Sequence, residues 1–301
     1  MAAVLLIHHA ANRGFHHPPN SLAGLAACLA AGARAVEVDV QALADGDFAL
    51  LHDAMLEEST TGRGPVGAQT ATGLRELRLV WRGQATGEPV ALLSQAVALL
   101  CDGGFRGEVQ LDLKAYATSP LTEERLRSLV RLVEPLEGPA QVRVSSQADW
   151  SLRRLHALAP DLSLGFDPLL YLDLRPPDED PQMPPYRRGA YGYRDDHPLA
   201  MVRWGPAGEY LAERAEALWA QAPWASAWYI RARVLERALD DGFDWIALLH
   251  ERGVVVDAWT LDAHRPEQVA LARRLVAAGV DRLTTNDPPA LAAVLGREAL
   301  L

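Results

Sequence analysis

The sequence predicts a single (βα)8 barrel, and its pattern and its length are the two observations behind this prediction. Short apolar runs typical of strands alternate with amphipathic runs typical of helices along most of the chain. Strands that alternate with helices at this spacing pair in parallel through right-handed crossovers. The chain has 301 residues, and barrels of about 250 residues routinely form one domain. We therefore expect residues 1–301 to form one closed barrel and not an open, doubly wound sheet.

The expected elements follow one another from the N-terminus. Apolar and β-branched runs predict strands at Val4–Ile7, Ala35–Val40, Val109–Leu113, Gln141–Val144, Leu162–Phe166, Val254–Trp259 and Arg282–Thr285. Phe48–His52 follows the turn signal Asp45-Gly46-Asp47 and predicts an extension of the second strand. Helical patterns cover Ser21–Ala31, Val90–Leu100, Thr122–Val133, Trp150–Leu158, Phe243–Arg252, Pro266–Ala278 and Pro288–Leu295.

One stretch, residues 167–227, breaks this alternation, and helix propensity returns only at Gly208–Ala220. The stretch is long for a loop, so we expect it to leave the barrel after about the fifth strand. Two interpretations stay open, an ordered lid over the catalytic face or a flexible surface insertion. Aromatic residues slightly favour the lid, and they are Tyr171, Tyr186, Tyr191, Tyr193 and Trp204.

Composition and charge limit the functions to consider. The net charge of −10 argues against binding nucleic acid, which needs a basic face, and weakly against anionic membranes. It permits a phosphorylated substrate, because a bound cation can reverse the local field. No run approaches the roughly eighteen apolar residues of a membrane span, and the N-terminus lacks the basic region of a signal peptide. Cys28 and Cys101 lie in helical patterns and predict core residues without a disulfide or zinc site, so we expect a cytoplasmic protein.

Three carboxylates and a lysine on two expected strands form the first candidate site. Alternate side chains of a strand share a face, so Glu37 and Asp39 point the same way, and Asp112 and Lys114 have the same spacing on the next barrel strand. Active sites of this fold lie at the C-terminal mouth, where buried carboxylates need a cation to offset their repulsion. Three oxygen ligands suit Mg²⁺ or Ca²⁺, and Lys114 would bind phosphate or pair with an acid. The alternative, acids that cap a strand end in water, is disfavoured by the valines that surround them.

Histidines at strand ends form the second candidate site. His8 and His9 end the first strand, and His52-Asp53 ends the extension after the second. One such histidine is more often structural, but histidines that converge on an acidic cluster suit acid–base chemistry, which needs one group to accept a proton and one to donate it. A His-ligated zinc site is a weaker alternative, because no H-x-x-x-H or similar spacing occurs.

The ordered series of motifs resembles the glycerophosphodiester phosphodiesterase family, whose fold is a (βα)8 barrel. That family carries HRG, P-E-N-T, E-x-D, D-G, H-D, T-T-x-G-x-G and E-I-K motifs in this order. The corresponding stretches here are His8-His9-Ala10, Pro18-Pro19-Asn20-Ser21, Glu37-Val38-Asp39, Asp45-Gly46, His52-Asp53, Thr60-Thr61-Gly62-Arg63-Gly64 and Asp112-Leu113-Lys114. Ala258-Trp259-Thr260 and Thr285-Asn286-Asp287-Pro288 resemble its C-terminal strands. The likeness spans residues 4–166 and about 250–297.

The resemblance implies metal-dependent hydrolysis of a small glycerophosphodiester to glycerol 3-phosphate and an alcohol. The neighbouring glycerol hydroxyl would attack phosphorus to give a cyclic phosphate that water then opens. The residues that the resemblance implies are His8 and His52 for acid–base catalysis, Glu37, Asp39 and Asp112 for Mg²⁺ or Ca²⁺, and Lys114, His9, Arg13 and Trp259 for the substrate.

Two departures from the family pattern keep other functions open. His9 stands where the family has the arginine of HRG, although Arg13 is close enough to supply a guanidinium, and Pro19 stands where the family has glutamate. Another register places HRG at Asn12-Arg13-Gly14 and removes one catalytic histidine. We prefer His8, because it directly follows the apolar strand. The alternatives are a lysophospholipase D-like enzyme on a lipid headgroup and a catalytically silent barrel that binds phosphodiesters or a partner protein.

Overall fold

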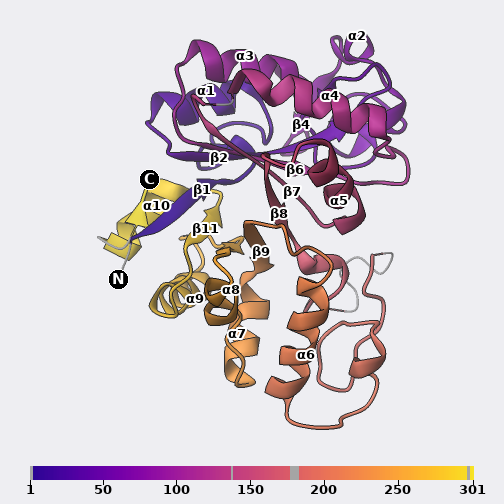
Figure 1. Ribbon diagram of the computed structural model, residues 1–301. Helices are drawn as coiled ribbons and strands as arrows, with labels where there is room; N and C mark the ends of the chain where they lie inside the picture. Colours follow the sequence, from indigo (N-terminus) through magenta and orange to yellow (C-terminus); the bar gives the residue numbers. More distant parts are fainter. Residues whose placement is uncertain (1–2, 137, 177–182, 297–298) are drawn as a thin grey trace.

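A closed barrel of parallel strands forms the centre of the molecule (Figure 1). The computed structural model describes residues 3–136, 138–176, 183–296 and 299–301, and eight strands form the ring in this part of the chain. In order around the ring they are β1 (Val4–His8), β2 (Ala35–Ala42), β6 (Glu108–Leu113), β7 (Gln141–Ser146), β8 (Ser163–Phe166), β9 (Ala227–Arg231), β10 (Val255–Trp259) and β11 (Arg282–Thr285). β1 pairs with both β2 and β11, which closes the ring and confirms the predicted (βα)8 barrel.

Helices cover the outer faces of the strands (Figure 1). They are α1 (Leu22–Ala30), α3 (Leu93–Asp102), α4 (Glu123–Val133), α5 (Asp149–Leu158), α6 (Ala207–Trp219), α7 (Ala232–Asp240), α8 (Trp245–Glu251), α9 (Pro266–Ala277) and α10 (Pro288–Leu295). Val36 and Val38 of β2 line one small internal void with Leu25 of α1 and Val97 of α3. Because side chains alternate along a strand, the residues between these valines must face the barrel interior. None of the described helices is long and apolar enough to cross a lipid bilayer.

The two ends of the chain meet at β1. The helix α10 lies beside β1, and the short strand β12 (Ala299–Leu300) pairs with β1 in parallel (Figure 1). The first and last parts of the sequence therefore support the same side of the barrel, and β1 is held by β2, β11 and β12.

Charged residues fill the floor of the barrel, at the end away from the strand C-termini. Glu108 forms ion pairs with Arg282 and with Arg143, whose Nε lies 3.5 Å from the glutamate Oε1. Asp257 accepts a hydrogen bond of 2.9 Å from the hydroxyl of Thr284. Glu108, Arg143, Arg282 and Asp257 are all buried, so these charged side chains close the floor, and the open end of the barrel is the mouth.

The region between β2 and α3 holds small elements that the sequence patterns predicted only in part. β3 (Phe48–Ala49) pairs antiparallel with β2, as expected for an extension of that strand, but it is shorter than predicted. The turn α2 (Ala71–Leu74) and the hairpin of β4 (Arg78–Trp81) and β5 (Gln84–Pro89) follow. They pack around a separate small cluster of buried apolar residues. The hairpin was not predicted, because its strands carry charged and glycine residues instead of an alternating apolar pattern.

The sixth barrel strand, β9, and the helix α7 were also not predicted. β9 ends at Arg231, and α7 begins at Ala232 with Arg231 as its N-cap residue. No glycine, proline or asparagine marks a turn between them, so the boundary signal that separates other strands from helices is missing here.

The long connection leaves the barrel after its fifth strand, β8, as predicted, and it contains α6. Tyr191 of the connection is buried against Tyr210 of α6, and their rings stack with centroids 4.2 Å apart. Asp195 accepts hydrogen bonds of 2.6 Å from the Tyr210 hydroxyl and from Arg214 Nε. The described part of the connection thus has a packed interior of its own, while its role as a lid stays a prediction.

Candidate active site

A cavity of about 830 Å³ opens at the C-terminal mouth of the barrel. Every barrel strand contributes a residue from its C-terminal half or from just beyond its end, and examples in ring order are His9, Asp39, Asp112, Ser145, Asp167, Arg231, Trp259 and Thr284. The size is in the upper range for small-molecule sites. The cavity also contains the three predicted acids, Lys114, and the histidines His9 and His52, but not His8.

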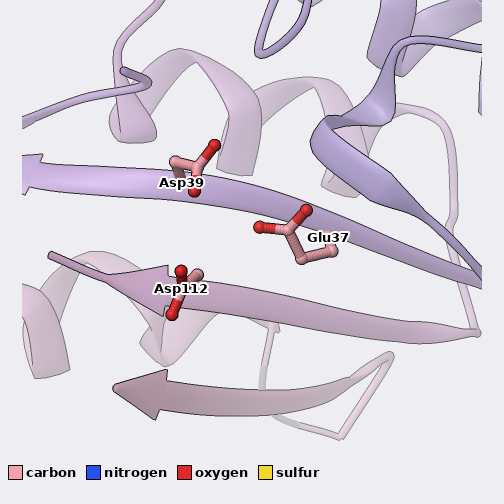
Figure 2. Close-up of side chains that lie close together, drawn as sticks. All are labelled: Glu37, Asp39 and Asp112. Carbon is pink, nitrogen blue, oxygen red and sulfur yellow. The ribbon is translucent and has the colours of Figure 1, made fainter. Parts of the chain in front are cut away.

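Three carboxylates meet on one wall of this cavity (Figure 2). Glu37 and Asp39 come from β2 and Asp112 comes from β6, and Asp39 is directly paired with Asp112 in the sheet. Each of the three acids offers an oxygen within 4.8 Å of the oxygens offered by the other two. Alternation along β2 turns both of its acids inward, as the sequence predicted.

Neighbouring groups fix these carboxylates in place. The backbone N–H of Ala10 donates a hydrogen bond of 2.6 Å to Glu37 Oε2. The side-chain amide of Asn20 donates to Asp39 Oδ2 at 2.7 Å and accepts from the Asp39 backbone N–H at 3.0 Å. Lys114 bridges two of the acids, since its Nζ lies 2.7 Å from Asp39 Oδ1 and 2.6 Å from Asp112 Oδ2.

The charges of this cluster do not balance. Burial raises the pKa of Glu37 well above its usual value, and the charges of Asp39 and Asp112 raise it further. Burial also acts to raise the pKa of Asp39, but the Lys114 ammonium and nearby histidines hold it below its usual value. One lysine therefore faces three acids, two of them buried. An all-oxygen donor set with excess negative charge fits a hard divalent cation such as Mg²⁺ or Ca²⁺.

The structure does not bring His8 to the carboxylates. His8 is paired with Val36, and paired residues of parallel strands face the same side, so its ring points outward to the helices like the valine. It is 3% exposed, and its Nδ1 lies 3.6 Å from Cys28 Sγ of α1. The expectation that His8 faces the site is wrong, because side chains alternate along a strand and a shift of one residue reverses the face.

His9 occupies the place expected for His8. It lines the cavity at the start of a short 3-10 turn, His9–Ala11, in which Ala10 and Ala11 have φ values of 47° and 45°. Such positive φ values are costly for alanine and are found where the surrounding structure enforces them. This turn also points the Ala10 N–H at Glu37, so one backbone feature positions both the histidine and a carboxylate.

Hydrogen bonds determine which nitrogen of His9 is free. Asp262 accepts hydrogen bonds of 2.9 and 3.2 Å from the Asn286 side-chain amide, which leaves the Asn286 Oδ1 to accept. That oxygen accepts from Asn12 Nδ2 at 2.8 Å and lies 2.9 Å from His9 Nδ1. His9 Nδ1 must therefore carry a proton, and Nε2 is the nitrogen that can take one up.

His52 also lines the cavity, as predicted. Its side chain is 60% exposed, and its Nδ1 lies 2.9 Å from Asp53 Oδ1. The hydrogen bond with Asp53 raises the pKa of His52, while Lys114 acts against it. Two hydrogen bonds hold this segment, from Gln41 Nε2 to the Asp53 carbonyl at 2.6 Å and from the Tyr116 hydroxyl to the His52 carbonyl at 2.8 Å.

The comparison with models of protein families shows to which family the chain belongs. Residues 9–179, more than half of the chain, match the model of the glycerophosphoryl diester phosphodiesterase family. The chain belongs to this family. A curated relative, the glycerophosphodiester phosphodiesterase of Caldanaerobacter subterraneus, is 28% identical over 157 residues, which cover 51% of this chain and 61% of the relative. The alignment thus spans about three fifths of that relative's length.

Solved structures share the fold across nearly the whole chain. A putative glycerophosphoryl diester phosphodiesterase from Silicibacter pomeroyi has a TM-score of 0.70 and 22% identity, over 98% of this chain and 93% of its own. A phosphodiesterase from Oleispira antarctica, solved with the product sn-glycerol-3-phosphate, has a TM-score of 0.67 and 20% identity over 97% of both chains. The described barrel therefore has the architecture of the family over its full length.

The remaining residues predicted for this family member divide between the cavity and its surroundings. Lys114 and Trp259 line the cavity. Arg13 is not among the lining residues, and its charge instead acts on His8, behind the strand. The sequence patterns did not single out Asn286 as the partner of His9, or Asp262 as the residue that orients Asn286. Both follow barrel strands at the same mouth, and this position is the signal that could have found them.

The buried His8 predicts a pH dependence of stability. Burial, together with the charge of Arg13, lowers its pKa to about 4 in the folded chain, below the value of about 6.5 in an unfolded chain. The unfolded state then binds more protons between these values, so stability is lost as the pH falls from about 6.5 towards 4. The loss amounts to about 2–3 kcal/mol. Urea unfolding at pH 7.5 and 4.5 should show this loss in the wild type but not in His8→Gln, and equal losses in both proteins would contradict it.

Proposed function

We propose that this chain is a metal-dependent glycerophosphodiester phosphodiesterase, which releases glycerol 3-phosphate and an alcohol. The observation that carries the proposal is the convergence of three carboxylates, Lys114 and two histidines on one cavity. The family membership supports it. The name of the Caldanaerobacter relative and the product bound to the Oleispira protein support the substrate class.

The carboxylate cluster is where the metal would bind, held by Glu37, Asp39 and Asp112. When bound, a divalent cation polarises a phosphoryl oxygen and stabilises the charge that develops on it. Lys114 contributes a second positive charge beside the same acids, where its ammonium group attracts an oxygen of the phosphate. The cluster and the lysine therefore orient the phosphate on the β2–β6 wall.

Proton transfer falls to His9 and His52 in this proposal, with His9 in place of His8. Asn286 holds the proton on His9 Nδ1, so the neutral ring presents Nε2 to the site, and this nitrogen takes the proton of the glycerol hydroxyl next to the phosphate. That oxygen forms a bond to phosphorus as the bond from phosphorus to the alcohol breaks, and His52, whose pKa is raised, gives its proton to the leaving oxygen. Water then opens the cyclic phosphate with the two roles exchanged.

The products formed from two substrates, glycerophosphocholine and lysophosphatidylcholine, test this function. We expect glycerophosphocholine with Mg²⁺ or Ca²⁺ to give glycerol 3-phosphate and choline, with the phosphate product followed by phosphorus NMR, because the three acids, Lys114 and both histidines line one cavity. EDTA should stop the reaction. Cleavage of lysophosphatidylcholine micelles without cleavage of glycerophosphocholine would favour a lysophospholipase D-like enzyme. Binding of glycerophosphocholine without any cleavage would show a silent barrel.

A further inference from the structure

We propose that Asp167 selects the substrate, through a hydrogen bond from its carboxyl group to the terminal hydroxyl of the substrate's glycerol group. The site would then prefer phosphodiesters with a free glycerol end over those whose end is acylated or lacks the hydroxyl. The inference rests on the proposed function and deepens it. Asp167 belongs to no motif that the sequence analysis used, and the proposed proton transfers do not need it.

The strand register places Asp167 on the inward face of the barrel, one layer nearer the mouth than Asp112. Asp112 of β6 is paired with Ser145 of β7, which is paired with Gly165 of β8. Asp167 lies two residues beyond Gly165, so it shares the inward face and stands one layer nearer the mouth. Two strand spacings correspond to roughly 10 Å across the sheet. A phosphate held beside Asp112 and its three-carbon chain can bridge such a separation.

One oxygen of the Asp167 carboxyl group is held by a hydrogen bond within the protein, and the other is available to a ligand. The side chain is 9% exposed and lines the cavity. Its Oδ1 accepts the backbone N–H of Leu169 at 2.9 Å, which caps the short turn Pro168–Leu170. Within the described ranges no group donates to the second oxygen, Oδ2. Asp167 lines the cavity, so an oxygen that no protein group engages is available there to a hydroxyl of the substrate.

The charges around Asp167 favour a neutral hydroxyl over a cationic headgroup. Arg231, on the neighbouring strand, lines the same cavity, and its guanidinium lies 5.1 Å from the centre of the Trp259 ring. The Nε of Arg231 also lies 3.3 Å from Asp173 Oδ1, so the arginine and this second carboxylate offset each other and leave no excess negative charge to attract a choline or ethanolamine group. Burial raises the pKa of Asp167 well above its usual value, with a further contribution from the charge of Asp112. A protonated carboxyl group both donates and accepts, as a hydroxyl does.

Two substrates and two variants test the proposal. The substrates are glycerophosphocholine and propane-1,2-diol phosphocholine, which lacks only the terminal hydroxyl and keeps the hydroxyl that attacks phosphorus. We expect the wild type to prefer the first by about tenfold to a hundredfold in kcat/KM. Asp167→Ser keeps an oxygen that can cap the turn but does not reach the cavity, and it should lose this preference by slowing only the first substrate. Asp167→Asn keeps both contacts and should stay within a few fold of the wild type.

The controls separate this proposal from a purely structural role and from the proposed function. Glu58→Gln removes a negative charge from an exposed residue elsewhere in the cavity lining and should leave the preference unchanged. Equal losses on both substrates in Asp167→Ser, or an unchanged preference, would overturn the proposal. If the wild type cleaves neither substrate, the proposed function is wrong. Titration calorimetry of the binding of two phosphate monoesters then tests the Asp167 contact separately. A wild-type preference for sn-glycerol 3-phosphate over propane-1,2-diol phosphate that Asp167→Ser abolishes would support the contact, and no preference would overturn it.

Discussion

Replacing His9 with alanine is expected to lower kcat for glycerophosphocholine by about two to four orders of magnitude. His9 lines the cavity, and the hydrogen bonds of Asn286 leave its Nε2 free to accept a proton. The ring contacts Asn286 at the end of the neighbouring strand β11 and stays partly exposed, so its removal should cost less stability than the loss of a buried core residue. Steady-state kinetics with saturating divalent metal measures the effect.

The adjacent histidine supplies the matched control. His8→Gln changes a side chain that faces α1 and contacts Cys28, so kcat should stay within a few fold of the wild type at pH 7.5. Circular dichroism of both variants shows whether the fold is intact. The opposite result, an inactive His8→Gln and an active His9→Ala, would mean that the first strand presents its histidines in the other register.

Replacing Glu37 with glutamine should lower kcat/KM by more than about a hundredfold, since changes next to metal ligands alone often cost ten- to a hundredfold. The same change should stabilise the metal-free protein. Glu37 is buried beside Asp39 and Asp112, and an amide of the same shape removes the repulsion while keeping an oxygen for the Ala10 N–H.

Thermal unfolding measures this second effect. In EDTA, the Tm of Glu37→Gln should exceed that of the wild type by roughly 2–4 °C for each kcal/mol of repulsion removed. Added Mg²⁺ or Ca²⁺ should raise the Tm of the wild type and not that of the variant, because a ligand stabilises only the protein that binds it. Equal metal-induced shifts in both proteins would show that Glu37 does not hold the metal.

The barrel and its acidic wall could be predicted from the sequence, because both depend on short-range periodicity. Alternation along β2 fixes the common direction of Glu37 and Asp39, and the same spacing on β6 brings Asp112 and Lys114 to the neighbouring strand. Val36 and Val38, which alternate with the acids, fix which face is buried against helices. Once the face that packs against the helices is known, a pattern with a period of two determines the direction of every other side chain in the strand.

Periodicity could not show which of two adjacent histidines faces the cavity. His8 and His9 are adjacent, and periodicity says only that they face opposite sides. The choice depends on where β1 ends and on the turn in which Ala10 and Ala11 have positive φ values, and neither alanine signals such a turn. The partners of His9 come from the other end of the chain, where Asn286 follows β11. Contacts over that separation depend on closure of the barrel.

The long connection shows a different limit. Its aromatic residues predicted some order, but the contacts that provide it, such as the stack of Tyr191 on Tyr210, join segments whose spacing follows no repeat. The sequence patterns did not predict β9 for a related reason, because the strand passes into α7 at Arg231 without a turn residue. Where elements join without glycine or proline, boundaries have to come from tertiary structure.

The most direct test of the central claim is the rate of glycerophosphocholine hydrolysis by EDTA-treated protein as a divalent cation is returned. The claim is that the three-carboxylate cluster holds a metal on which phosphodiester cleavage depends. We expect no measurable hydrolysis in the treated wild type and a saturable recovery with Mg²⁺ or Ca²⁺, and no such recovery in Glu37→Gln. Full hydrolysis by the metal-free protein, or none with either cation, would contradict the account.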